Sequence, residues 1–329
     1  MSSPSEPLKN SRPSAQLMAF GVVAVGLLGL FGKPLLALFA YTSQSQLNSH
    51  ILLVPFVSAY LLYIRRHTLP EKVTSSPAWA VIPAAIGGFA LFLAWNPSFF
   101  ASPLSQNDYL ALTTLAFVSF LVAAGFLFLG KKWMAAATFP VAFLIFMVPM
   151  PDVMADTLET ASKLASADAA YFFFILSGTP ILRDGTTFQL PGIAIQVAQE
   201  CSGIRSSWVL IITSLLAANL FLETTWRRIV LVFFVIPLGI LRNGFRIMVI
   251  GVLCVRIGPE MINSIIHRRG GPVFFCLSLI PLFLLLWWLR RGEVKAFGLR
   301  SNALPEKESA STPGTPAEES LAEANLKKV

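Results

Sequence analysis

The sequence predicts an all-α polytopic membrane protein with about eight transmembrane helices, on the basis of three observations. The 329 residues are 55% hydrophobic and only 13% charged, whereas an average soluble domain is about 25% charged. Apolar runs near the length of a membrane crossing recur along most of the chain, and such runs form helices in a bilayer. Pairs of basic residues follow every second run, as charges that set topology do.

Eight apolar runs are expected to span the membrane. The second is short for a full crossing, and the fifth can extend to Val148 because Pro149 is the first clear stop. The expected spans are residues 17–39, 51–64, 79–95, 109–129, 133–146, 202–222, 229–253 and 272–289.

Loop charge sets the expected orientation. Loops rich in Lys and Arg stay in the cytoplasm, so both termini are expected there. The basic loops follow the second, fourth, sixth and eighth spans and carry Arg65, Arg66, Lys72, Lys131, Lys132, Arg227, Arg228, Arg290, Arg291, Lys295 and Arg300. A cluster of Arg256, Arg268 and Arg269 departs from this rule on the outer side, which suggests a function there.

Residues 149–200, between the fifth and sixth spans, predict a small extracytoplasmic cap. Residues 154–176 mix charged and apolar side chains at helical spacing, which favours a helix on the membrane surface or against the bundle. Asp184-Gly185 and Pro191-Gly192 are turn signals, and residues 193–198 alternate as a strand does. The cap is therefore a helix followed by a hairpin.

Three segments divide the chain. Residues 1–16 are expected to be a cytoplasmic N-terminal segment, 17–289 a transmembrane domain, and 290–329 a cytoplasmic, largely disordered tail rich in Pro, Glu, Ser, Ala and Lys. The first apolar run lacks a convincing cleavage site, so no cleavable signal peptide is expected. No inverted repeat typical of transporters is evident.

Composition also excludes several classes of site. The net charge of +8 comes from basic residues scattered beside apolar segments, which does not make a nucleic-acid surface. Of the three cysteines, Cys254 and Cys276 lie in apolar surroundings, and neither a Cys-x-x-Cys motif nor a His-rich cluster occurs. We therefore expect no disulfide framework, no metal and no cofactor.

The remaining cysteine, Cys201, stands where the cap meets the sixth span, in the string Glu200-Cys201-Ser202-Gly203-Ile204-Arg205-Ser206-Ser207. A thiol in the first turn of a helix beside an arginine is favoured as thiolate, the reactive form. Taken alone, however, Cys201 is better interpreted as a membrane cysteine without a role.

The expected topology brings further polar residues to the outer side, namely Arg242 and Arg246 in the seventh span, His267 before the eighth and His50 at the mouth of the second. An arginine within a span costs about 2.5–3.5 kcal/mol on insertion scales and normally faces a partner or a wet cavity. Each residue also has a structural interpretation. Arg246 can reach the headgroups, His267 can be interfacial, and His50 can cap a helix.

Together these residue types suit nucleophilic acyl transfer. A thiolate attacks a carbonyl, a histidine moves the proton and a guanidinium stabilises the oxyanion. Arg205, one turn after Cys201, either holds the thiolate or a substrate carboxylate, or pairs with a local acid such as Glu200.

The sequence resembles the exosortase and archaeosortase family of membrane transpeptidases over roughly residues 17–289. The motifs that carry the resemblance are Cys201-Ser202-Gly203-Ile204-Arg205-Ser206-Ser207, Asn243-Gly244-Phe245-Arg246-Ile247 and His267, with weaker support from Ser49-His50 and Met147-Val148-Pro149-Met150-Pro151. A histidine at the third position resembles the bacterial exosortase branch.

The resemblance implies a catalytic set of Cys201, Arg246 and His267, supported by Ser202, Gly203, Asn243, Arg205 and His50, with Arg242 as the alternative guanidinium. It further implies a bacterial inner-membrane enzyme whose active site faces outward. Its substrates are exported proteins ending in a sorting signal, a Pro-Glu-Pro-like motif followed by a membrane helix and a basic cluster. The acyl group passes to an unknown amine acceptor or to water.

A non-enzymatic function is the alternative. In a transporter or a polysaccharide-export component, the intramembrane arginines bind an anionic ligand. In that case neutralising Arg242 or Arg246 impairs transport and Cys201→Ser is harmless.

Overall fold

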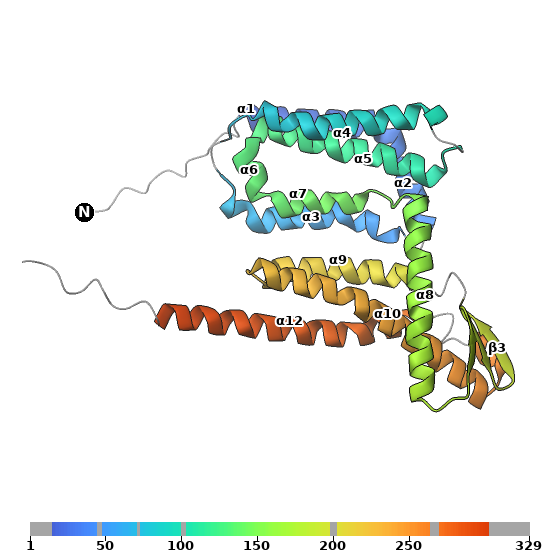
Figure 1. Ribbon diagram of the computed structural model, residues 1–329. Helices are drawn as coiled ribbons and strands as arrows, with labels where there is room; N and C mark the ends of the chain where they lie inside the picture. The colour runs from blue at the N-terminus through green and yellow to red at the C-terminus, as the bar shows by residue number, and fades with distance from the viewer. Residues whose placement is uncertain are drawn as a thin grey trace, which may run out of the picture.

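The computed structural model describes residues 15–44, 48–70, 73–99, 103–197, 203–263 and 270–302. Long helices lie side by side, helix α8 crosses their ends, and a small sheet lies beyond α8 (Figure 1). Within the described ranges four helices are long and apolar enough to cross a membrane, or up to six if each of two bent pairs is one span. The protein is therefore an α-helical multi-pass membrane protein, and the count of eight remains a prediction.

Short helices alternate with long ones in the N-terminal half. They are α1 (Ala15–Leu30), α2 (Gly32–Gln44), η1 (Ser49–Leu53), α3 (Val54–Ile64), η2 (Arg65–Thr68), α4 (Pro77–Trp95), η3 (Pro97–Phe99), α5 (Gln106–Ala124), the π-helical η4 (Gly125–Leu129), α6 (Gly130–Ala136), α7 (Thr138–Phe143) and η5 (Leu144–Met147).

The C-terminal half contains the crossing helix, the sheet and three further long helices. These are α8 (Asp152–Leu176), β1 (Leu182–Asp184), β2 (Thr187–Leu190), β3 (Ile193–Gln196), α9 (Ile204–Phe221), α10 (Thr225–Arg256), η7 (Pro259–Asn263) and α12 (Gly271–Asn302). Helix α12 continues past residue 289, where the eighth span was expected to end and the tail to begin.

Two of the expected spans are broken, which the sequence analysis did not anticipate. The first is the pair α1 and α2, bent by 66°, and the fifth is divided into α6, α7 and η5. A proline ring clashes with the carbonyl four residues before it and removes a hydrogen bond. Pro34 and Pro140 stand four residues after Leu30 and Ala136, where α1 and α6 end, and so account for both breaks.

Between residues 152 and 196 the structure has helix α8 followed by a three-stranded sheet, where a helix and a hairpin were expected; that residues 149–200 form an extracytoplasmic cap stays a prediction. Helix α8 is bent by 90° from the preceding helical stretch 138–147. The strands pair antiparallel in the order β1-β2-β3, and two-residue loops at Gly185-Thr186 and Pro191-Gly192 join them. Their apolar faces pack with α8 and α10 in one core of Ala167, Ala170, Phe174, Phe188, Leu190, Ile195, Val197, Ile247, Ile250 and Cys254.

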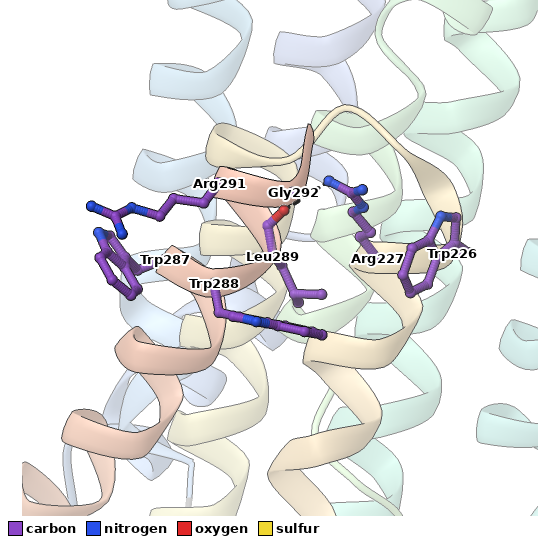
Figure 2. Close-up of a pocket in the computed structure, with 7 residues that line it drawn as sticks. All are labelled: Trp226, Arg227, Trp287, Trp288, Leu289, Arg291 and Gly292. Atoms are coloured by element: carbon purple, nitrogen blue, oxygen red, sulfur yellow. Dashed lines mark hydrogen bonds between the residues drawn. The ribbon is translucent and has the colours of Figure 1, made fainter. Parts of the chain in front are cut away.

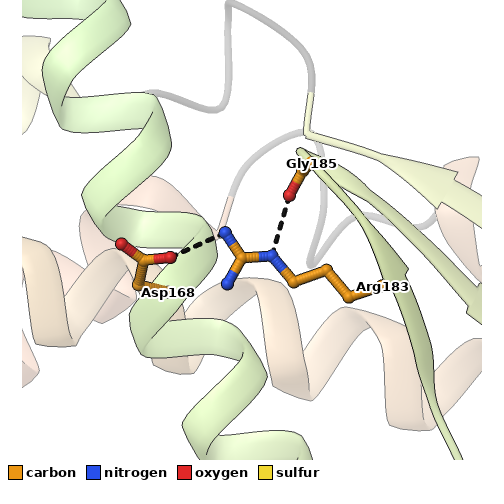
Figure 3. Close-up of polar contacts among 3 residues, drawn as sticks. All are labelled: Asp168, Arg183 and Gly185. Atoms are coloured by element: carbon orange, nitrogen blue, oxygen red, sulfur yellow. Dashed lines mark hydrogen bonds and ion pairs between the residues drawn. The ribbon is translucent and has the colours of Figure 1, made fainter.

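Arg183 joins this sheet to α8. Its Nη2 lies 2.6 Å from the Asp168 carboxylate, and its Nε donates to the Gly185 carbonyl at 2.8 Å (Figure 3). The first β-turn and the helix are therefore held by the two ends of one guanidinium.

A polar latch fixes the start of α8 against α5. The Asn107 amide donates to the Met150 carbonyl and to the Asp152 carboxylate, both at 2.7 Å. The Asp152 backbone N–H donates to Asp108 at 2.9 Å. These contacts hold the 90° bend that turns α8 across the bundle.

The other end of the bundle carries the basic residues. Arg65, just after α3, donates to Asn219 near the end of α9 at 2.6 Å, and Arg227 in the first turn of α10 donates to the Leu289 carbonyl of α12 at 2.8 Å. The ends of α3, α9 and α12 lie together, opposite α8 and the sheet (Figure 1). Basic residues that follow the second, sixth and eighth expected spans thus lie at one end of the bundle, and the orientation expected from loop charge stays a prediction.

Candidate functional site

Helix α9 begins at a glycine that the local geometry requires. Gly203 is the N-cap residue of α9 and has a φ of 73°, in the left-handed region, where a side chain is disfavoured. A Cβ there would also lie 2.8 Å from Cγ of Asn243, which is only 2% exposed. Two of the expected supporting residues, 40 positions apart, are therefore in contact.

Arg242 ties α10 to the first turn of α9. Its Nη2 donates to the Gly203 carbonyl oxygen and to Ser207 Oγ, each at 3.3 Å. The side chain is buried, and among the described residues its Nη1 has no hydrogen-bond partner. The guanidinium is thus bound to α9 through Nη2.

Small residues let α9 and α10 approach closely at this point. A Cβ on Gly239, one turn before Asn243, would lie 2.7 Å from Ser207 Oγ. Ser206 Oγ donates to the Gly203 carbonyl at 3.0 Å. That carbonyl therefore accepts from Arg242 as well as from its own helix.

Arg246 lies one turn after Arg242 on the same helix and is half-buried. Its neighbour Phe245 contacts Phe173 of α8 and Phe274 of α12, with ring centroids 5.8 and 6.2 Å apart. Gly244 meets α8 directly, because a Cβ there would lie 2.6 Å from Ala169 Cβ. The turn of α10 that carries Arg246 is consequently enclosed by α8, α9 and α12.

His50 also reaches the first turns of α9. Trp208 donates from Nε1 to His50 Nε2 at 3.2 Å, and the Trp208 ring stands edge-on to Phe146. Nε2 is thereby an acceptor, which is the neutral tautomer with its proton on Nδ1. The contact places His50 beside Trp208, which follows in the sequence the Ser207 that accepts from Arg242.

Several expected site residues lie outside the described residues. These are Cys201, Ser202 and His267, together with the side chain of Arg205. The first described residue after Cys201 and Ser202 is Gly203, and the first after His267 is Gly270, which is buried. Within the described part of the chain, no group of three or more His, Cys, Asp or Glu side chains is placed to hold a metal ion.

Comparison with known families decides the class of protein. The family model of the transmembrane exosortases matches residues 41–284 of the chain. The chain belongs to the transmembrane exosortase family. No curated protein and no solved structure matches it.

Membership in the exosortase family supports a general role as a membrane transpeptidase that acts on exported proteins. It confirms the resemblance drawn from the two motifs. The roles of the individual site residues of this exosortase remain proposals.

Sequence reasoning missed three residues that shape the site, namely Ser207 as an acceptor for Arg242, Trp208 as a donor to His50, and Gly239. Gly239, Asn243 and Arg246 follow one another at helical spacing, which places them on neighbouring turns of one helix. That spacing is the sequence signal that identifies Gly239.

Proposed function

We propose that this exosortase is a cysteine transpeptidase. It cleaves the C-terminal sorting signal of exported proteins and transfers the new C-terminus to an amine acceptor. Cys201 is the nucleophile, Arg246 stabilises the oxyanion and His267 transfers protons. No cofactor takes part in these steps.

The reaction balances without an added oxidant or reductant. The Cys201 thiolate attacks the carbonyl carbon of the scissile peptide, and the carbonyl oxygen becomes an oxyanion beside Arg246. The C–N bond breaks as His267 gives a proton to the departing amine, leaving a thioester. An acceptor amine then attacks the thioester and loses a proton to His267, and the C–S bond breaks to release the Cys201 thiolate.

The contact between Arg242 and Gly203 carries this proposal. It joins the segment that follows Cys201 in the sequence to the segment that holds Arg246. Because Arg242 Nη2 is occupied by α9, we assign Arg242 to positioning and Arg246 to the oxyanion. A guanidinium in such a water-poor site acts strongly, since the local dielectric is low.

Helix α8 and the three-stranded sheet lie at this end of the bundle (Figure 1), and we propose that they form a cap over the active site. We place the cap and the active site on the extracytoplasmic side of a bacterial inner membrane, with about eight spans and both termini in the cytoplasm. The cap precedes Cys201 directly in the sequence, so it can guide a peptide toward the thiol. The basic cluster of the sorting signal would remain on the cytoplasmic side.

The three cysteines provide a matched test. Cys201→Ala in cells that coexpress a protein with the sorting signal should abolish processing and the hydroxylamine-sensitive thioester, both measured by mass spectrometry. Cys276→Ala, at an exposed position of α12, should process as the wild type does. Processing by Cys201→Ala would exclude the cysteine mechanism. The transport alternative predicts another result. In that case Cys201→Ser leaves function unchanged, and the Arg242 and Arg246 variants lose transport.

A further inference from the structure

A cavity of about 400 Å³ lies at the basic end of the bundle, far from the site described above. Trp226 and Arg227 from α10 line one side of it, and the last turns of the apolar part of α12 line the other (Figure 2). The residues from α12 are Trp287, Trp288, Leu289, Arg291 and Gly292. The lining combines indole rings with guanidinium groups.

Arg227 is half-buried in this cavity and only partly satisfied. Its Nη1 donates to the Leu289 carbonyl at 2.8 Å, and its Cζ lies 5.2 Å from the centre of the Trp226 ring. Its buried Nε has no hydrogen-bond partner among the described residues. A buried cationic N–H group without an acceptor is costly, so an oxygen ligand there would be favourable.

Arg291 supplies a second cation with open edges. Its Cζ lies 3.8 Å from the centre of the Trp287 ring, and stacking of this kind uses the face of the guanidinium and leaves its N–H groups free for a planar or tetrahedral anion. In the described ranges neither Arg227 nor Arg291 has a carboxylate at ion-pair distance.

The acidic residue beside the cavity is already engaged. The Glu293 carboxylate accepts from the backbone N–H groups of Glu223 and Thr224, at 3.1 and 2.7 Å. It therefore binds the backbone just before α10, and the Arg227 charge also acts on it electrostatically, whereas Arg291 has no carboxylate at ion-pair distance in the described ranges. Arg228 and Arg290 stand close by and add to the positive field, with Arg228 donating to the Leu222 carbonyl and Arg290 facing the Phe221 ring.

Position identifies the source of the anion. Helices α10 and α12 are long and apolar enough to cross a membrane, and Trp side chains gather at the level of lipid headgroups. All three Trp side chains of the cavity are more than half exposed, so they offer apolar surface to a glycerol backbone and acyl chains. Basic pockets between membrane helices bind anionic headgroups.

We propose that this cavity binds the phosphate-bearing headgroup of an anionic phospholipid. The phosphate oxygens accept from the Arg227 guanidinium, Arg291 adds its charge from the side of α12 that carries Trp287 (Figure 2), and Trp288 and Leu289 contact the glycerol and acyl region. Trp and Arg residues are common at the membrane–water interface, so the residue types alone do not indicate a binding site. The cavity between α10 and α12 is the observation that indicates one.

The experiment measures retained lipid, so it is independent of transpeptidase activity. The full chain is reconstituted in nanodiscs of phosphatidylcholine with a minor fraction of phosphatidylglycerol, then transferred to detergent for native mass spectrometry. Arg291→Gln should lower the retained phosphatidylglycerol about fivefold. Arg66→Gln is the control, because Arg66 likewise stacks on a ring, that of Tyr63 at 4.1 Å, but lies outside the cavity.

A charge-neutral variant separates a built site from general attraction to the bilayer. Gly292→Leu fills the cavity, since even a Cβ there lies 3.3 Å from the Arg227 guanidinium, and it should lower retention as Arg291→Gln does. Full retention by Gly292→Leu, or equal loss in Arg66→Gln, would overturn the proposal. Displacement of the lipid by millimolar inorganic phosphate would also overturn it, because the ligand would then be free phosphate.

Discussion

Arg242 donates through Nη2 to the carbonyl oxygen of Gly203, a contact of 3.3 Å between α10 and the first residue of the α9 segment. Arg242 is only 8% exposed, and a buried cation is tolerated when it finds oxygen partners. The contact holds the start of α9, which follows Cys201 in the sequence, against the turn of α10 that lies just before Arg246. The geometry of any reaction at Cys201 therefore depends on how α9 sits on α10.

Gly203→Ala should disrupt this junction. Alanine in the left-handed conformation costs about 1–2 kcal/mol, and the new Cβ would meet Asn243 at 2.8 Å, so the start of α9 has to move. We expect a lower midpoint of thermal unfolding in detergent and a loss of substrate processing.

Gly178→Ala is the matched control for that variant. Gly178 has a φ of 68°, close to that of Gly203, but no atom lies within 4 Å of its Cβ position. It carries the conformational cost without the clash, so processing should persist. Equal loss of processing in both variants would contradict the role given to the Asn243 contact.

Lysine substitutions should separate the two arginines of α10. Arg246→Lys should reduce the rate of thioester formation about 10²–10³-fold, the usual effect of losing one oxyanion donor, with little change in substrate binding. Lysine does not reproduce the oriented fork of a guanidinium. Single-turnover acylation with a sorting-signal peptide would measure the rate.

Arg242→Lys should act differently because Arg242 holds α9. Loss of its contacts to Gly203 and Ser207 should lower the thermal unfolding midpoint, and Ser207→Ala should reproduce a smaller part of that change. A stable Arg242→Lys protein with the larger loss of acylation rate would reverse the assignment, making Arg242 the oxyanion donor.

The fold was predictable where a local pattern decides it. The turn signals lie at the two tight turns: Gly185 follows the last residue of β1, and Pro191-Gly192 joins β2 to β3. The alternating apolar residues Ile193 and Ile195 both pack on the core, as the pattern predicts. The breaks before Pro34 and Pro140 were not predictable. Prolines at 83, 237 and 281 lie inside unbroken helices, because neighbouring groups can satisfy the carbonyls that a proline frees in a membrane helix.

The residues proposed for the site come from the sequence, whereas the contacts among the described ones come from the structure. The two motifs contain Gly203, Asn243 and Arg246, and the place of Arg242 within the seventh span pointed to it as the alternative guanidinium. Their packing, however, depends on how two helices face each other across a 40-residue separation. The sequence left the roles of Arg242 and Arg246 open because residues four apart share one helix face. Their difference arises from α9, which approaches Arg242.

Gly244→Leu should displace α8 from α10. A Cβ at Gly244 would lie 2.8 Å from the backbone nitrogen of Ala170, and backbone cannot yield as a side-chain end does. Overpacking of this kind costs about 1–3 kcal/mol, so the unfolding midpoint and processing should both fall. Gly88→Leu is the control, because its Cβ position on α4 is open. An unchanged midpoint in Gly244→Leu would mean that α8 is not docked there.

Arg183→Ala should loosen the sheet more than Asp168→Asn does. The Asp168 side chain is 70% exposed, and ion pairs of this kind contribute about 0–1 kcal/mol, so Asp168→Asn should change little. Arg183 also donates to the Gly185 carbonyl (Figure 3), and its guanidinium lies over the rings of Tyr171 and Phe188. Its truncation therefore removes packing as well as charge.

Limited proteolysis of the purified protein should cleave Arg183→Ala faster within residues 182–196, while Asp168→Asn and the exposed strand control Asp184→Asn resist as the wild type does. Equal resistance of Arg183→Ala would show that the apolar core alone holds the sheet on α8.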